Sequence, residues 1–248
     1  MEKSFSVDIQ PIIRDLQDRD FTVSDDNSVV VRGDATAFVG IDAPLEVVPV
    51  ANGRPLTVIS AVSNTVESGH VPILVANQDC RETVSKFLSS PFGLVGAQND
   101  TRQFYATEGR IRLTDGSYAC AATDEPLQWT EAPESESAES RQLRLMVNNE
   151  LIAIIDSVEA IACPAPQPTS FRYRYSRNEN GRFVVYDGTE SIGTYPGVSA
   201  MRADGIQPVP APLIPEQHID SNAQLARATV LATVDDRSVR YSSTVTTQ

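Results

Sequence analysis

Lysine is almost missing from this chain. Only Lys3 and Lys86 are lysines among its 20 basic residues, and 33 acidic residues leave a formal net charge of -13. Asp and Glu are short, strongly hydrated anions, so acids in place of lysine raise surface hydration and make molecules repel one another in ordinary buffer. At molar salt the Debye length shrinks to about 3 Å, which screens that repulsion.

The residue usage, rich in Asp, Val, Ala and Thr with Arg in place of Lys, resembles that of cytosolic proteins from salt-adapted archaea. This resemblance implies a halophilic, cytoplasmic protein whose stability rises with KCl concentration. The alternative is an acidic protein from a GC-rich bacterium, where arginine also displaces lysine.

Scarce lysines, cysteines and histidines exclude several kinds of site. Neither lysine follows a glycine, so there is no phosphate-binding P-loop. The cysteines are odd in number without a Cys-x-x-Cys pair, which predicts buried free thiols and neither a disulfide framework nor a zinc site. Two histidines leave little for acid–base or metal chemistry, and we expect no cofactor and no metal. These residues are Cys80, Cys120, Cys163, His70 and His218.

Long apolar runs and a basic surface are also missing. No segment approaches the about 18 apolar residues of a membrane span, and residues 1–5 lack the start of a secretory signal. We therefore expect a soluble protein without a membrane partner. The negative charge gives no basic footprint, so a nucleic-acid partner is not supported.

Apolar spacing predicts an α+β fold that begins with a mixed α/β layer. Apolar residues at i, i+3, i+4 and i+7 predict a helix over residues 7–19. Strands are expected at 21–24, 28–32 and 35–41, with another apolar stretch at 45–50. A helix from residue 55 to a stop at Gly69, a buried strand over 71–76 and a helix opened by a capping box of Asp79 and Glu82 follow.

The rest of the chain is predicted to be β-rich, with a hairpin turn at Asp115-Gly116. Residues 131–140 contain no apolar residue larger than alanine, which predicts an acidic Ser/Glu linker or loop. It separates an α/β domain with a β-rich extension (1–130) from a β-rich domain (141–248). The proline tract 208–215 is expected to run extended over the surface. The chain ends in a hairpin around Asp235-Asp236, or in a helix over 223–232.

A weak internal repeat relates the turn Asn148-Asn149 to the turn Asp187-Gly188, at an offset of 40 residues. Each copy is expected to be a hairpin followed by a short helical turn. Chance similarity is the alternative, since hairpins share turn residues and alternation. The aligned residues are Glu150, Ile152, Ala153, Val158, Ala160 and Ile161 with Glu190, Ile192, Gly193, Val198, Ala200 and Met201.

The predicted order of helix, three strands, helix and strand over residues 7–76 resembles the core of restriction-endonuclease-like nucleases. That resemblance implies a divalent metal held by an acid near the second strand and by a Glu-x-Lys on the third. Asp34 is the candidate for the first acid and Asp42 is a further one. Because the run 35–41 contains neither an acid nor a lysine, a degenerate member is favoured over an active one.

Two other segments have residue patterns that are typical of ligand-binding or partner-binding sites. Residues 77–79 follow the buried strand 71–76 at a helix start, where open α/β sheets place ligands, but helix capping by Asp79 explains them without a ligand and is favoured. The same position predicts a lowered pKa for Cys80. Alternating residues 171–175 give one aromatic and one basic strand face, for stacking bases or anchoring a protein, or else a core face and a solvated face. They are Phe171, Arg172, Tyr173, Arg174 and Tyr175.

These observations favour a non-enzymatic binding or assembly module of a halophilic cytosol over an enzyme, with a protein partner or self-association. The alternatives are a degenerate or metal-dependent nuclease-like enzyme using Asp34 and Asp42, and a structural component of a larger particle. Pull-down at native ionic strength would discriminate among the three.

Overall fold

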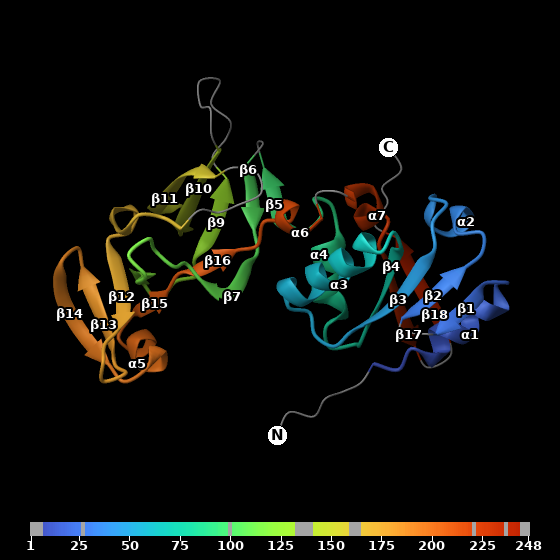
Figure 1. The fold of residues 1–248 in the computed structure, drawn as a ribbon, viewed down its shortest axis with the longest axis horizontal. Coiled ribbons are helices and arrows are strands. Elements are labelled where there is room, and N and C mark those ends of the chain that lie inside the picture. The colour runs from blue at the N-terminus through green and yellow to red at the C-terminus, as the bar shows by residue number, and fades with distance from the viewer. Residues whose placement is uncertain are drawn as a thin grey trace. The chain divides into compact units, whose positions relative to one another are not determined.

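The computed structural model describes residues 7–25, 28–98, 101–131, 141–158, 165–219, 222–235 and 238–243. The chain forms two compact units, and the second is inserted into the first. Unit 1 consists of residues 1–95 and 215–248, and unit 2 of residues 96–214 (Figure 1). The predicted α+β class with a β-rich later part is confirmed, since unit 2 is built almost entirely of strands.

Unit 1 is a mixed six-stranded sheet in the order β1-β2-β3-β4-β17-β18. The central strands β3, β4 and β17 are parallel, and antiparallel strands flank them on both sides. The strands are β1 (Thr22–Asp25), β2 (Val29–Arg32), β3 (Leu45–Val50), β4 (Val71–Ala76), β17 (Val230–Asp235) and β18 (Ser238–Ser243). All six residues of β4 are buried, as its continuous apolar sequence predicts for a central parallel strand.

Helices cover both faces of this sheet. Ile12 and Leu16 of α1 (Gln10–Asp18) are fully buried against one face, and each contributes about 1.5–3 kcal/mol. The helix α3 (Pro55–Glu67) connects β3 to β4 and packs on both strands. The remaining helices of unit 1 are α2 (Thr36–Val39), α4 (Arg81–Leu88), α6 (Glu216–Ile219) and α7 (Ala223–Arg227).

Two local predictions in unit 1 are wrong. Residues 35–41 form no strand: Thr36–Val39 are the short helix α2, which Gly40 ends at φ 72°, and the third strand is β3. Asp79 does not cap α4, whose N-cap is Cys80; instead Asn77 Oδ1 accepts a hydrogen bond from the Cys80 amide at 2.9 Å. The predicted order is otherwise present, with α2 inserted between the second and third strands and the third strand ten residues later than expected.

Unit 2 contains two five-stranded antiparallel sheets, β11-β10-β9-β6-β5 and β14-β13-β12-β8-β15, and a two-stranded pair of β7 and β16. The first sheet consists of β5 (Leu94–Gln98), β6 (Thr101–Phe104), β9 (Gln128–Glu131), β10 (Arg141–Val147) and β11 (Glu150–Val158). The second consists of β8 (Tyr118–Ala122), β12 (Tyr173–Arg177), β13 (Phe183–Asp187), β14 (Glu190–Tyr195) and β15 (Ile206–Pro208). The other elements are β7 (Ala106–Arg110), β16 (Pro210–Pro212), α5 (Val198–Ala203) and the 3₁₀ helix η1 (Pro168–Ser170).

The two sheets of unit 2 share one strand-pairing pattern. Leu145 pairs with Ala153 in the hairpin β10–β11, and Val185 pairs with Gly193 in β13–β14, an offset of 40 on both strands. A register shift follows Leu145 in the first hairpin and Val185 in the second. The pattern extends inward, because Trp129 of β9 pairs with Leu145 as Tyr175 of β12 pairs with Val185.

Both sheets also have an aromatic pair where the next strand of the sheet is added. Phe104 of β6 is opposite Trp129, and Tyr118 of β8 is opposite Tyr175. The hairpin part of the predicted repeat is therefore present as two matching four-stranded arrays. The helical part is seen only as α5 in the second copy, because residues 159–164 of the first lie outside the described residues.

The contacts divide the chain at 95/96 and 214/215, not around residues 131–140 as the sequence suggested. Glu131 ends β9, β10 begins at Arg141, and the two strands pair with each other, so this acidic segment connects neighbouring strands and does not link domains. Residues 132–140 themselves lie outside the described part. Sequence composition gave no sign that residues 215–248 return to unit 1.

Two predictions near the C-terminus are resolved. The tract 208–215 is extended, but not over the surface: Val209 is fully buried, and Leu213 is 1% exposed. Its backbone bonds to neighbouring strands, with the Val209 amide donating to the carbonyl of Ala119. The closing hairpin β17–β18 is present and pairs Asp235 with Ser238, and only residues 223–227 of the alternative helix are helical. Within the described residues, no helix is long and apolar enough to cross a membrane.

Candidate functional site

The candidate metal ligands Asp34 and Asp42 are both exposed, Asp34 after β2 and Asp42 before β3. No group of three His, Cys, Asp or Glu side chains with metal-binding geometry occurs among the residues that the structure describes. The third strand does carry an acid, since β3 contains Glu46-Val47-Val48. Valine thus stands where the Glu-x-Lys pattern needs lysine.

Glu46 has a different partner, which the sequence did not reveal. Its Oε2 lies 2.9 Å from Nδ1 of His70, and the two side chains are 14% and 19% exposed. Because β3 and β4 are parallel and Glu46 is in register with Pro72, the residue just before β4 comes beside it. The pair of Glu46 and His70 joins β3 and β4 near their amino ends, and Cys80 lies beyond the opposite end of β4.

A cavity of about 310 Å³ lies at the carboxyl ends of β4 and β17, where ligands bind in open α/β sheets. Two of its polar side chains already accept hydrogen bonds from the backbone beside a helix start. Asp8 Oδ1 accepts from the Gln10 amide, and Asn77 Oδ1 accepts from the Cys80 amide. Asp79, the residue that the sequence predicted as the cap of α4, makes neither of these bonds.

Cys80 was predicted to have a lowered pKa at the start of α4, and this is wrong. Its thiol is buried between the carbonyl oxygens of Val50 and Asn77, each 3.8 Å from Sγ. Burial raises the pKa of Cys80 and outweighs the backbone hydrogen bonds that lower it. Cys120 is also buried, which raises its pKa to about 12. Cys163 lies outside the described residues.

The segment 171–175 alternates as expected between aromatic and basic residues. Phe171 is 4% exposed and Tyr175 is fully buried, where its ring stacks on Tyr118 at 5.5 Å. Burial raises the pKa of Tyr175, although the Arg110 guanidinium, which donates to its hydroxyl, acts in the opposite direction. Tyr175 lies in the core cluster that contains Cys120, and Phe171 is also buried, so neither ring is available for stacking on a partner.

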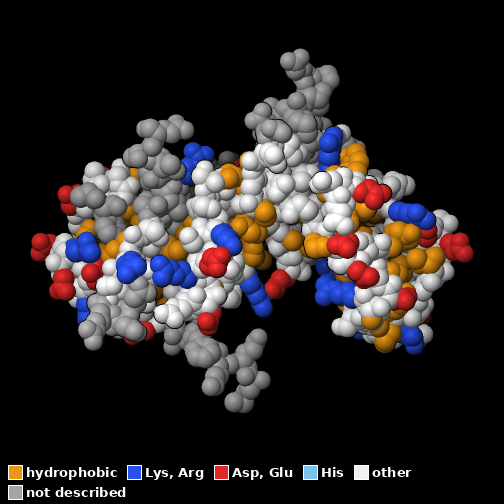
Figure 2. Space-filling view, turned by 180° about the vertical axis from the view of Figure 1, so that it is seen from behind, with side chains coloured by type: hydrophobic (Ala, Val, Ile, Leu, Met, Phe, Trp, Pro, Cys, Tyr) orange, Lys and Arg blue, Asp and Glu red, His pale blue; other side chains and the backbone are white. Residues whose placement is uncertain are grey.

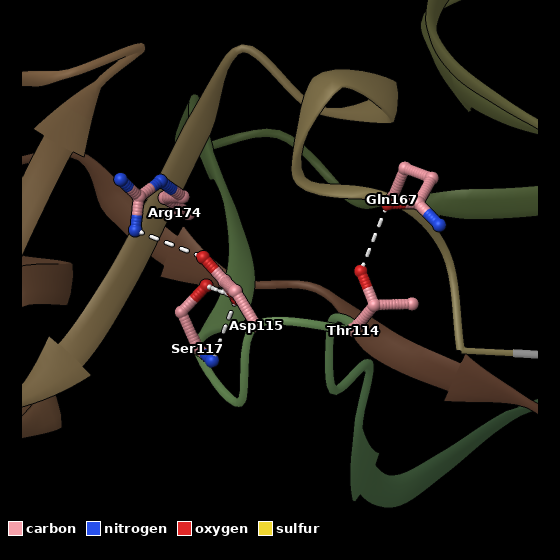
Figure 3. A network of polar contacts seen from close by, with 5 residues as sticks. All are labelled: Thr114, Asp115, Ser117, Gln167 and Arg174. Carbon is pink, nitrogen blue, oxygen red and sulfur yellow. Dashed lines mark hydrogen bonds and ion pairs between the residues drawn. The ribbon is translucent and has the colours of Figure 1, made fainter.

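The arginines of this segment have partners within the protein. Arg172 forms an ion pair with Asp187 at 3.0 Å, and Arg174 lies 3.2 Å from Asp115. Figure 3 shows the second contact: Asp115 lies in the turn just before Gly116 and β8, and it also accepts hydrogen bonds from the amide and hydroxyl of Ser117. Those bonds, and secondarily Arg174, lower the pKa of Asp115. The segment therefore has one face in the core and one basic face whose arginines pair with acids of the same chain. Its role as a partner surface stays a prediction.

The matching bulges of unit 2 are the feature that sequence alternation missed. Ile152 of β11 and Ile192 of β14 are the extra residues at the two register shifts, and they are 38% and 46% exposed. A bulge sets two residues of one strand against one of its partner, which breaks the two-residue alternation from which burial is predicted. No other described strand pairs with the outer side of β11 or β14.

On the face shown in Figure 2, acidic and basic side chains are interspersed with exposed hydrophobic side chains. No family model, curated protein or solved structure matches the chain.

Proposed function

We propose that this chain is a non-enzymatic assembly module of a salt-rich cytosol, which associates with a second copy of itself through the outer strands of unit 2. The observation that carries the proposal is the pair of matching bulges that expose Ile152 and Ile192 at equivalent positions of two sheet edges. Sheet edges readily pair with other chains, and proteins protect them with charges, prolines, short strands or β-bulges, so we expect the exposed isoleucine side chains, and not added strand pairing, to make this contact.

Apolar burial supplies the driving force for this association. A fully buried isoleucine contributes about 1.5–3 kcal/mol, and these two side chains are already more than half covered, so each contributes less than that figure. Leu151, 46% exposed and next to Ile152, extends the apolar surface of β11. In a two-fold dimer each surface is used twice, so the apolar free energy of each contact counts twice.

A second copy is the favoured occupant because each molecule presents the same two surfaces. A two-fold contact is self-complementary, which two equivalent apolar edges satisfy without any further partner. The exposed acids Glu150 and Glu190 occupy equivalent positions beside the isoleucines, so the contact brings like charges together. Molar salt screens that repulsion, which joins the acidic composition to the proposed assembly.

The test is the molecular mass in molar KCl, measured by light scattering, of the wild type and of the double variant Ile152→Asp, Ile192→Asp. We expect a dimer for the wild type and a monomer for the variant, because each aspartate replaces an apolar contact by a hydrated charge. Leu56→Asp is the matched control, since Leu56 is 43% exposed on α3 of unit 1. A double variant that keeps the dimer mass, or a Leu56→Asp protein that loses it, contradicts the proposal.

A second candidate concerns unit 1, as a degenerate relative of the nuclease core. The element order and the acid Glu46 on the third strand support it, while Val48 in place of lysine removes the residue that orients water. We expect calorimetry with Mg²⁺ in molar KCl to show no binding. Binding that is lost in Asp34→Ala and retained in Asp18→Ala, a change to an exposed acid of α1, would instead favour a metal-dependent enzyme.

A further inference from the structure

A pocket of about 400 Å³ lies over the first sheet of unit 2, on the face opposite the buried ring of Trp129. Strand pairing sets Gln103, Thr130 and Arg144 in one row across β6, β9 and β10, since Thr130 is in register with both of the others. The turn residues 148–149 line one end. The volume is within the range of about 300–1,000 Å³ typical of small-molecule sites.

Arg144 is the one basic residue in the lining. Its Nε is buried and has no hydrogen-bond partner in the described part of the chain, whereas buried guanidinium groups are normally paired. Its neighbours across the strands are Thr130 and Ile154, neither of which carries a charge. A buried donor on a cation that lacks an acceptor is stabilised by any anion that reaches it.

The acid in the lining is already neutralised. Both carboxylate oxygens of Glu131 are bonded to Arg102, by Nε to Oε2 and by Nη2 to Oε1 at 3.0 Å. Arg144 therefore gives the pocket its one cation without a bonded counter-charge among the described residues.

The other polar lining groups are uncharged hydrogen-bonding groups. Both hydrogens of the Gln128 amide are committed to the carbonyls of Phe104 and Trp129, so only its Oε1 remains for a ligand and accepts from hydroxyl groups. Met146 adds an apolar wall. Hydroxyl and amide groups around a single arginine match a hydroxylated molecule with one oxyanion.

We propose that this pocket binds a small hydroxylated oxyanion, a sugar phosphate or a sugar acid, with Arg144 as the anion-binding residue. Arginine presents a planar fork of donors that fits phosphate and carboxylate oxygens in a bidentate manner. The site is on the sheet face and the assembly surface is at the strand edges, so the two proposals fail independently.

Calorimetric titration in molar KCl with three probes tests the site: glucose 6-phosphate, gluconate and neutral glucose. We expect one or both anions to bind saturably at one site per chain, and glucose not to bind. Binding of glucose 6-phosphate alone assigns the phosphate source, and binding of gluconate alone assigns the carboxylate source. Failure of both anions to bind, or equal binding of glucose, overturns the proposal.

Two substitutions identify the residue responsible. Arg144→Gln is expected to weaken anion binding by about ten-fold or more, and Arg144→Lys, which keeps the charge without the planar fork, to weaken it less. Arg202→Gln is the matched control, because it removes the same charge from an exposed position on α5. Near-ultraviolet circular dichroism confirms that each variant is folded. Equal weakening by Arg202→Gln contradicts a site at Arg144.

Discussion

Trp129 shows how a single buried polar atom secures unit 2. Its ring is 1% exposed, and Nε1 donates a hydrogen bond to the Pro210 carbonyl at 2.7 Å. Trp129→Phe removes the donor and leaves that acceptor unsatisfied, which we expect to cost about 1–3 kcal/mol in the free energy of unfolding. Urea unfolding followed by circular dichroism measures it. An unchanged midpoint would show that the hydrogen bond contributes nothing.

His218 makes stability depend on pH. Burial lowers its pKa below the ordinary 6.5, so below pH 6.5 the unfolded chain takes up a proton that the folded protein does not. The free energy of unfolding is therefore expected to be highest above pH 6.5 and to fall as the pH drops below it.

His218→Gln is expected to flatten this dependence between pH 6.5 and the range where carboxylates titrate. The substitution leaves intact the hydrogen bond from the Ser63 hydroxyl, which is made to the backbone carbonyl of residue 218. Denaturant unfolding at several pH values checks this. The same slope in both proteins would assign the effect to groups other than His218.

The residue types in the sequence were enough to exclude certain kinds of site. They did not predict which charged side chains are paired in the fold. The absence of a P-loop or a Cys-x-x-Cys pair follows from the letters alone. The direction of the Cys80 pKa does not, because it depends on how deeply the thiol is buried against Val50. The same holds for Arg144, whose Nε lacks a hydrogen-bond partner among the described residues because its neighbours across two strands are uncharged.

The turn of the β10–β11 hairpin can be made more stable by substitution. Asn148 and Asn149 have φ of 47° and 68°, as in a type I′ turn, in which both central residues are left-handed. Asn149→Gly is expected to leave stability unchanged or to raise it by up to about 1 kcal/mol, while Asn149→Val lowers it by about 1–2 kcal/mol. Thermal unfolding compares the three proteins. A valine variant as stable as the wild type would contradict the left-handed backbone at this position.

Elements with strong apolar periodicity, such as α1 and α3, were predicted from the sequence, and so was the fully apolar β4. Residues 35–41 were not, because β-branched and aromatic residues there favour a strand while Gly40 permits the left-handed end of a short helix. The bulges in β11 and β14 were invisible for a related reason. An inserted residue changes which face every following side chain takes.

At the scale of the whole molecule, the excess of acids makes stability depend on salt. With a net charge of -13, the folded protein repels itself at low ionic strength, and KCl screens that repulsion. We expect the free energy of unfolding to rise from low to molar KCl, measured by urea unfolding at each concentration. A flat or falling curve would contradict a halophilic origin and favour the alternative of a GC-rich bacterial source.

The fold class was predicted because composition and periodicity are local properties of the sequence. The organisation into units was not, since the return of residues 215–248 to the sheet of unit 1 depends on β17 pairing in parallel with β4, more than 150 residues away. The internal repeat was detected at 40 residues, yet its extension to β6, β8, β9 and β12 needed the strand register.

The molecular mass of the wild-type chain in molar KCl, measured by light scattering over a range of protein concentrations, shows whether the proposed dimer forms. We expect a dimer that dissociates to the 26.9 kDa monomer on dilution, and a higher dimer fraction at higher KCl. A monomer at every protein and salt concentration would contradict the proposal.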